Sequence, residues 1–142
     1  MRVKRLIIFM ILLWTLLGII MGERFLSHAY KKGWILANFD SIGAKRVSLL
    51  LQKKDTLNIL DVRTINEYKH RHLKNAIHIP LTELSEKIHQ LKVDKSKPII
   101  VYCKSGSRSV KASRILADNG YHPLNVQGGI RQLMRNHVEL SR

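Results

Sequence analysis

The sequence predicts an α/β domain, in which a mostly parallel β-sheet is covered by helices on both faces, preceded by one membrane-spanning helix. Three observations predict this architecture. The chain opens with a long uncharged apolar run, short strand-like apolar segments then alternate with segments of helical periodicity, and no repeat or low-complexity segment interrupts them. Such alternation is typical of parallel sheets whose crossover helices pack on both faces. In these folds ligands bind at the carboxyl ends of the strands.

The first element is the apolar run at residues 6–22, which reads LIIFMILLWTLLGIIMG and contains no charged residue. A helix of this length spans about 26 Å, slightly less than the roughly 30 Å hydrocarbon core of a bilayer. The flanking Lys4, Arg5 and Arg24 can extend their charged ends to the membrane surface and cover the difference. We therefore expect a basic flank at 1–5, a transmembrane anchor at 6–22 and a linker at 23–34.

A cleaved signal peptide is the alternative interpretation of the same run. The start MRVKR fits it, and Ser27-His28-Ala29 resembles a small-x-small cleavage site. The run is longer than the usual apolar region of about 7–15 residues and charges follow it directly, so we favour an uncleaved anchor. The basic start predicts a single-pass protein of a bacterial-type inner membrane with its domain on the periplasmic side. The lysine pair at 31–32 leaves a cytoplasmic domain as the alternative.

The domain is expected over residues 35–142. It begins with a helix at 44–54, whose apolar residues fall on one helical stripe. The segment LNILDV at 57–62, in which four of six residues are apolar, predicts a buried strand. A second short strand is expected at 76–79, where Pro80 ends it.

The second half of the domain continues the alternation. Apolar residues at helical spacing predict a helix at 81–91, with Thr82 as its N-cap. A third strand is expected at 99–102, followed by a helix at 107–119 that an Asn-Gly pair ends. A last strand at 124–126 and the start of a final helix at 130–134 complete the domain.

The only cysteine, Cys103, stands directly after the strand at 99–102, within the stretch VYCKSGSRS. A lone cysteine forms no internal disulfide and is usually a small buried hydrophobe. Here, however, small and basic residues lead from it into the helix at 107–119. Backbone N–H groups and the positive end of that helix favour an anion. These surroundings lower the pKa of a thiol, and we therefore interpret Cys103 as a reactive thiolate whose sulfur is accessible.

The formal net charge of +15 predicts an affinity for something anionic. The basic residues are spread as pairs, and no zinc-finger spacing or aromatic RNA-binding motif is present, which argues against nucleic acid. We expect a lipid surface or a small anion instead.

Three blocks of sequence resemble the single-domain rhodaneses, a family of sulfurtransferase domains. The first block is Leu60-Asp61-Val62-Arg63 with Glu67-Tyr68, and the second runs from His72-Leu73 to Ala76 and Ile79-Pro80. The third is the stretch 101–109, followed by Ala112, Leu116, Gly120 and Gly128-Gly129. This chain departs from the family pattern at Arg71 and Asn75, where glycine is usual, and at Leu133, often a tryptophan.

The resemblance implies a rhodanese-like fold and a sulfurtransferase that works through a persulfide on Cys103. The sulfur would come from a small anionic donor such as thiosulfate and pass to a thiol or dithiol acceptor. The residues expected to bind the donor, with Arg108 holding its charge, are Lys104, Ser105, Gly106, Ser107, Arg108 and Ser109.

Asp61, Arg63 and Glu67 are expected in supporting roles. Asp61 either orients the active-site loop or caps a neighbouring turn, and Arg63 and Glu67, four apart, are expected to pair locally. The resemblance implies no metal and no organic cofactor. His70 and His72 lack a third ligand at suitable spacing, and His72 fits the family's structural histidine better.

Two other functions compete with sulfur transfer. In cysteine phosphatases of the C-x5-R type the loop holds a phosphate dianion, but here Arg108 follows after four residues and Ser109 takes the sixth position. The loop is therefore one residue short. The non-enzymatic alternative is a membrane-tethered rhodanese-like binding module, although this chain keeps the cysteine and its whole loop.

Overall fold

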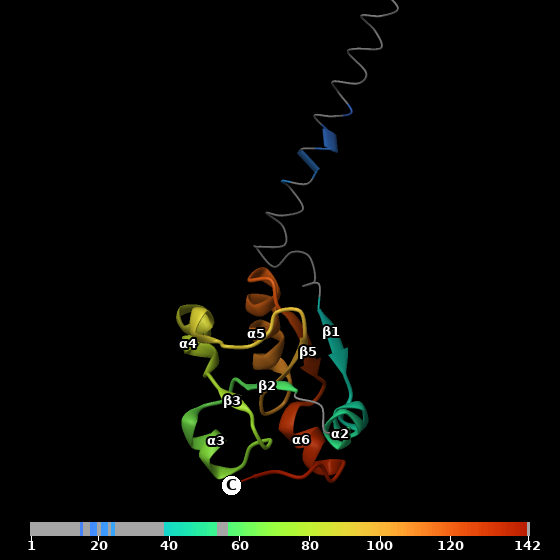
Figure 1. Ribbon diagram of the computed structural model, residues 1–142, viewed down its shortest axis with the longest axis vertical. Coiled ribbons are helices and arrows are strands. Elements are labelled where there is room, and N and C mark those ends of the chain that lie inside the picture. Colours follow the sequence, from blue (N-terminus) through green and yellow to red (C-terminus); the bar gives the residue numbers. More distant parts are fainter. Residues whose placement is uncertain are drawn as a thin grey trace, which may run out of the picture. The chain divides into compact units, whose positions relative to one another are not determined.

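The computed structural model describes residues 39–53 and 57–141, together with residues 15, 18, 19, 21, 22 and 24 (Figure 1). The chain divides into two compact units, Met1–Ala37 and Asn38–Arg142. Most residues of the anchor predicted at 6–22 and of the linker at 23–34 lie outside the described residues. Within the described part of the chain, no helix is both long and apolar enough to span a bilayer.

The second unit is built on a five-stranded sheet in the order β1-β5-β4-β2-β3, and every neighbouring pair is parallel. The predicted α/β architecture with a parallel sheet is confirmed. The strands are β1 (Asp40–Ile42), β2 (Asn58–Asp61), β3 (Ile77–His78), β4 (Pro98–Tyr102) and β5 (His122–Val126).

Strand β1 was not predicted from the sequence. Its three residues, Asp-Ser-Ile, contain one apolar side chain and are at most half-buried, so they give no strand pattern. The strand exists because β5 supplies its hydrogen-bonding partner, with Ser41 opposite Asn125 and Ile42 opposite Val126.

The helices connect the strands and cover both faces of the sheet (Figure 1). They are α2 (Ala44–Gln52), α3 (Ile65–His70), α4 (Leu81–Lys87) with the 3-10 turn η1 (Ile88–Gln90), α5 (Ser107–Asp118) and α6 (Gly129–Arg135). Pro80, not the predicted Thr82, stands at the N-cap of α4, because the helix already begins at Leu81.

Helix α3 was also missed, because its six residues contain no apolar stripe. A capping box starts it instead. The Thr64 hydroxyl accepts the N–H of Glu67, while the Glu67 carboxylate accepts the N–H of Thr64 at 3.1 Å. Such reciprocal bonds satisfy two of the N–H groups that a helix start leaves free.

The core consists of two apolar layers, one on each face of the sheet. Leu60 and Val101 face α4 and α5, while Ile59, Ile100 and Tyr102 face α2 and α6. Strand β4 lies in the middle of the sheet, and its last four residues are buried. The end of β4 is therefore held rigidly at the centre of the domain.

The two positions at which the sequence departs from glycine behave differently. Asn75 has a φ of 61°, a left-handed conformation that asparagine tolerates. Arg71 has a φ of −160°, which is extended backbone that any residue adopts. Neither departure therefore disturbs the fold.

Candidate active site around Cys103

Cys103 follows β4 at the carboxyl edge of the sheet, and the next residues fold around its sulfur. The N–H of Gly106 donates to Cys103 Sγ at 3.1 Å. Gly106 has a φ of 105°, which residues with a side chain rarely adopt, and α5 begins one residue later. The Ser109 hydroxyl donates to the Gly106 carbonyl at 3.0 Å and so closes the loop on itself.

The side chain of Cys103 is fully buried, whereas the sequence suggested an accessible sulfur. Burial raises the pKa of the thiol. Hydrogen bonds from the Ser109 hydroxyl and from the N–H groups of Ser109, Gly106 and Ser105 lower it, and the net pKa lies below the ordinary value. The single hydroxyl proton of Ser109 serves either the sulfur or the Gly106 carbonyl. The Gly106 N–H is therefore the donor that the geometry assigns to the sulfur.

The side chains of the loop point in different directions. Lys104, Ser105 and Ser107 are exposed, Arg108 is half-buried and Ser109 is completely buried. All six residues predicted to bind the donor belong to the loop. Only Lys104, Ser105 and Ser107 present exposed side chains.

Arg108 does not point freely toward a substrate. Its Nη1 and Nη2 atoms bind Glu67 Oε2 and Oε1 at 2.7 and 2.8 Å, a two-pronged ion pair between α5 and α3. The Arg108 bond, with help from Thr64, holds the pKa of Glu67 at about 2. The prediction that Glu67 pairs with Arg63 is wrong, because the capping box turns Glu67 toward the loop of Cys103.

Arg63 pairs instead with Asp61, and both side chains are buried. Asp61 Oδ1 accepts the Arg63 N–H and Nε at 2.9 Å each, so the carboxylate caps the turn that follows β2. Arg63 Nη2 also donates to the Arg71 carbonyl at 2.5 Å. Burial lowers the pKa of Arg63, but the bonds and charge of Asp61 raise it to a net value above the ordinary one. Of the two roles expected for Asp61, these hydrogen bonds correspond to the capping of a neighbouring turn.

Tyr102, the residue before Cys103, belongs to the same buried network. Its ring lies 5.5 Å from the Arg63 guanidinium carbon, and its hydroxyl accepts the N–H of Leu73 at 3.0 Å. Burial, together with the negative charge of Asp61, raises the pKa of Tyr102. The tyrosine is thus a neutral support beneath the cysteine loop.

The start of α6 supports the loop from the other side, a contact that the sequence analysis missed. Ile130 N–H donates to the Cys103 carbonyl at 2.8 Å and Arg131 N–H to that of Lys104 at 3.3 Å. A Cβ atom on Gly129 would lie only 2.4 Å from the Cys103 carbonyl oxygen, so the close approach requires glycine. The Gly128-Gly129 pair is the feature of the sequence that could have indicated this contact.

The histidines that the sequence raised as metal ligands have other contacts. His72 stacks on Tyr68 at 4.0 Å between ring centroids, and His70 is exposed. His78, which was not raised as a ligand, stacks on the same Tyr68 ring at 4.4 Å. Over residues 39–53 and 57–141, no group of three His, Cys, Asp or Glu residues could hold a metal ion.

The comparison with protein families identifies the domain. The model of the rhodanese-like domain matches residues 44–136, and the chain belongs to this family. The match includes the cysteine loop, both arginine–carboxylate pairs and the first turns of α6.

Similar proteins carry several names. The thiosulfate sulfurtransferase PspE of Escherichia coli is 36% identical over 80 residues, which are 56% of this chain and 77% of PspE. The putative sulfur carrier protein YrkF of Bacillus subtilis is 35% identical over 112 residues. The match covers 75% of this chain but only 60% of YrkF. A tRNA uridine(34) hydroxylase of Yersinia enterocolitica is 35% identical over 68% of this chain and 29% of its own length.

Solved structures show the same fold. A rhodanese-related protein from Thermoplasma volcanium superposes with a TM-score of 0.65 at 28% identity, covering 72% of this chain and 98% of that protein. A rhodanese-like domain protein from Staphylococcus aureus gives a TM-score of 0.62 at 27% identity, covering 67% and 91%.

Proposed function

We propose that this protein is a sulfurtransferase, which moves sulfane sulfur from a donor such as thiosulfate to a thiol or dithiol acceptor. The observation that carries the proposal is the hydrogen-bonded sulfur of Cys103, whose pKa is lowered although the side chain is buried. A thiolate is the nucleophilic form of cysteine. The name of the similar PspE protein agrees with this activity.

In the first step the Cys103 thiolate attacks the outer sulfur of thiosulfate. A bond forms between the two sulfurs, the bond to the inner sulfur breaks, and sulfite leaves with the electron pair. In the second step the acceptor thiolate attacks the outer sulfur of the Cys103 persulfide. The transferred sulfur stays with the acceptor, and Cys103 departs as the thiolate. Both steps are nucleophilic displacements, and no metal or organic cofactor takes part.

The backbone N–H groups around the sulfur stabilise its negative charge in both steps. We assign Arg108 as a positioning residue, because both ends of its guanidinium are bound to Glu67. Lys104 and the hydroxyls of Ser105 and Ser107 remain exposed for contacts with the donor.

The test is transfer of sulfur from thiosulfate to dithiothreitol by the full chain, with mass spectrometry of Cys103 after donor treatment. The wild type should turn over and carry one additional sulfur atom on Cys103. The Cys103→Ser variant should do neither, because a hydroxyl stays protonated near neutral pH. Hydrolysis of an aryl phosphate without thiosulfate turnover would favour a phosphatase. Absence of both activities would favour the binding module.

We also propose that residues 6–22 anchor the chain in a bacterial-type inner membrane, with the domain on the periplasmic side. The support is the uncharged sequence and its basic flank. The full chain should resist extraction from membranes by carbonate, and a reporter fused after Arg142 should be active only outside the cytoplasm. An intact chain in the soluble fraction would contradict the anchor.

A further inference from the structure

Three segments near the cysteine loop contain basic residues but no acidic ones. At this edge of the sheet, the segments that follow β1, β4 and β5 are 43–49, 103–111 and 127–132, and they include no Asp or Glu. The segments that follow β2 and β3 carry Glu67, which binds Arg108, and Glu83, which binds Lys87. The exposed cations of the first three segments, which we call the basic rim, are Lys45, Arg46, Lys104, Lys111 and Arg131. Within the described residues, none of the five forms an ion pair, and Arg108 between them is neutralised by Glu67.

Backbone hydrogen bonds bring the rim segments together. Gln127 N–H donates to the Ile42 carbonyl at 3.0 Å, which joins the end of β5 to the start of α2. The contacts of Ile130 and Arg131 join the start of α6 to the cysteine loop, from which α5 departs. The rim therefore brings cations from both faces of the sheet to the side of the cysteine loop where β1, β5 and β4 end.

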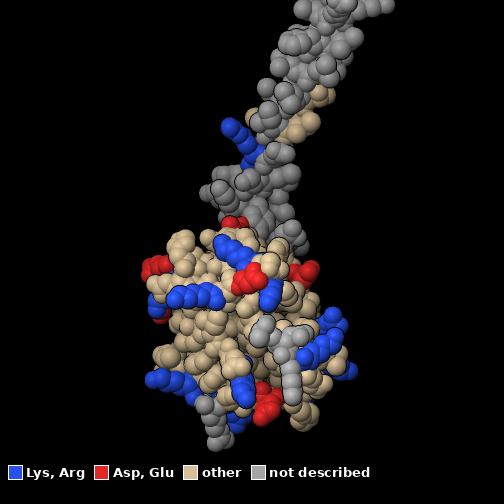
Figure 2. All heavy atoms as spheres, in the orientation of Figure 1, with Lys and Arg blue, Asp and Glu red and all other residues tan. Residues whose placement is uncertain are grey.

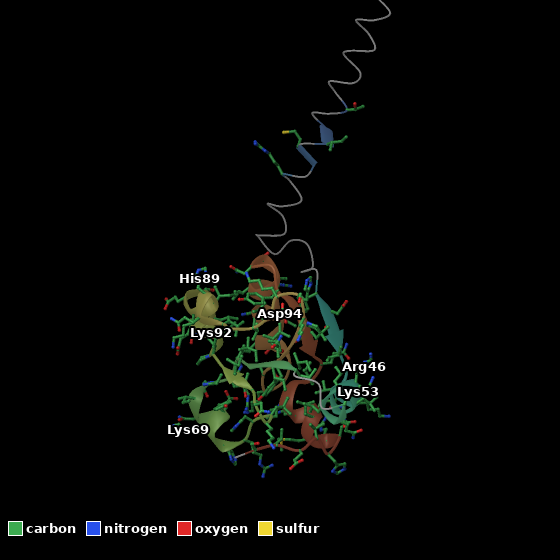
Figure 3. The ribbon with its side chains drawn as sticks, viewed as in Figure 1. Arg46, Lys53, Lys69, His89, Lys92 and Asp94 are labelled. Carbon is green, nitrogen blue, oxygen red and sulfur yellow. The ribbon has the colours of Figure 1, made fainter. Side chains whose placement is uncertain are left out.

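The other end of the sheet is different. Asp94 precedes β4 and Asp118 is the last residue of α5, and neither forms an ion pair within the described residues. Figure 3 labels Asp94 between Lys92 and Arg46 of α2 in this view, nearer to Lys92. On the face displayed in Figure 2, Asp and Glu side chains occur among Lys and Arg. The absence of acids is thus a feature of the rim segments.

The rim is too wide for the sulfur donor alone. Neighbouring strands lie about 4.8 Å apart, so the ends of β1, β5 and β4 span about 10 Å before their helices are included. A thiosulfate ion is a single dianion that needs only the cysteine loop. Cations spread over three elements match the carboxylates of a macromolecule.

We propose that the basic rim is the docking surface for an acidic protein that carries the acceptor thiol. A protein is favoured over a lipid surface because the rim lies beside the loop of Cys103, and only a partner that presents a thiol makes use of that position. Ile65, beside the Glu67–Arg108 pair, is 48% exposed and offers an apolar contact. The proposal rests on the sulfurtransferase function, and the persulfide sulfur passes to the partner by the displacement described above.

The experiment compares two synthetic peptides that differ only in charge. Each has one cysteine, flanked in one peptide by glutamates and in the other by glutamines at the same positions. The full chain is loaded with thiosulfate, and the second-order rate constant of peptide persulfide formation is measured. At low salt (about 20 mM) the glutamate peptide should react at least about 10-fold faster, and the ratio should fall toward about 1 near 500 mM salt.

A pair of charge-matched variants locates the effect. Lys45→Glu with Lys111→Glu changes the rim outside the cysteine loop and its supports. Lys92→Glu with Lys97→Glu makes the same charge change around Asp94, which Figure 3 labels together with Lys92. The rim variant should lose the preference for the glutamate peptide, by about 10-fold or more, and the control variant should keep most of it. Both should transfer sulfur to uncharged dithiothreitol at the wild-type rate.

The outcomes separate the two proposals. Wild-type transfer to dithiothreitol with equal rates for both peptides would overturn the docking surface and leave the sulfurtransferase intact. No transfer to any acceptor would overturn the sulfurtransferase itself. If phosphatidylglycerol liposomes distinguish the rim variant from the control variant and the peptides do not, the rim is a lipid surface and the docking proposal is wrong.

Discussion

The two arginine–carboxylate pairs beside Cys103 are built in contrasting ways. Asp61 and Arg63 are two residues apart, and their side chains are 0% and 5% exposed. Glu67 and Arg108 are 41 residues apart, and their side chains are 25% and 31% exposed. The buried pair holds the turn after β2 and its removal would leave a charge without a partner. The more exposed pair contributes little free energy but fixes the start of α5 relative to α3.

The largest expected effect comes from breaking the buried pair. Asp61→Asn leaves the buried Arg63 guanidinium without its counter-charge, and we expect a loss of about 3–5 kcal/mol in the free energy of unfolding. Urea denaturation of the full chain measures it. Adding Arg63→Met removes the uncompensated charge and should restore part of the loss. A change below about 1 kcal/mol in the single variant would show that the pair is not what stabilises this turn.

Breaking the more exposed pair should separate stability from activity. Glu67→Gln should lower the free energy of unfolding by only about 1 kcal/mol, because the pair is partly solvated. Sulfur transfer should fall by roughly 10-fold, because displacement of reacting groups by a fraction of an ångström is costly. Arg108→Lys, which keeps the charge but loses the two-pronged geometry, should show the same split. Equal losses in stability and activity would contradict a positioning role.

Lowering the pH should weaken the Glu67–Arg108 pair over a defined range. The pKa of Glu67 is about 2 in the folded chain and about 4.5 ordinarily, so its stabilising contribution is complete above about pH 4.5. The contribution is lost as the pH falls from about 4.5 toward about 2. The urea midpoint of the wild type should fall more steeply over this range than that of Glu67→Gln. Parallel curves would mean that Glu67 does not titrate through this interaction.

The smallest effect on stability is expected for the Lys87–Glu83 pair, which serves as the reference for a surface ion pair. Lys87 and Glu83 lie four apart on α4 and are 45% and 42% exposed. Glu83→Gln should change the free energy of unfolding by about 0.3–0.5 kcal/mol and leave sulfur transfer unchanged. A loss as large as that of Glu67→Gln would remove the distinction between a surface pair and the pair that spans α3 and α5.

What the sequence predicted well was local, and what it missed depends on the folded chain. The strands at 57–62 and 99–102 have continuous apolar patterns, and the whole cysteine loop is one contiguous stretch. Glu67 and Arg108, 41 residues apart, meet only because α3 and α5 pack at the same edge, and nothing in the sequence between them marks them as partners. Likewise, β1 has too few apolar residues to be recognised without β5 beside it.

The burial of Cys103 was missed for a related reason. A loop of small residues after a strand suggests an open site, but its glycines allow close approach. Gly106 turns the backbone onto the sulfur, and Gly129 lets α6 press against the cysteine carbonyl. The small residues that suggested an accessible sulfur therefore allow the backbone to bury Cys103.

The order of the strands has a consequence for biosynthesis. Among the described strands, β1 is the first to leave the ribosome, and its one neighbour in the sheet is β5, which follows about eighty residues later. At roughly 5–20 residues per second, the leading strand waits several seconds for its partner. During that time it has no neighbour to bind, and the short Asp-Ser-Ile segment offers little surface for wrong pairing. A weak β1 is therefore an advantage during translation, since the sheet is complete only after β5 has been made.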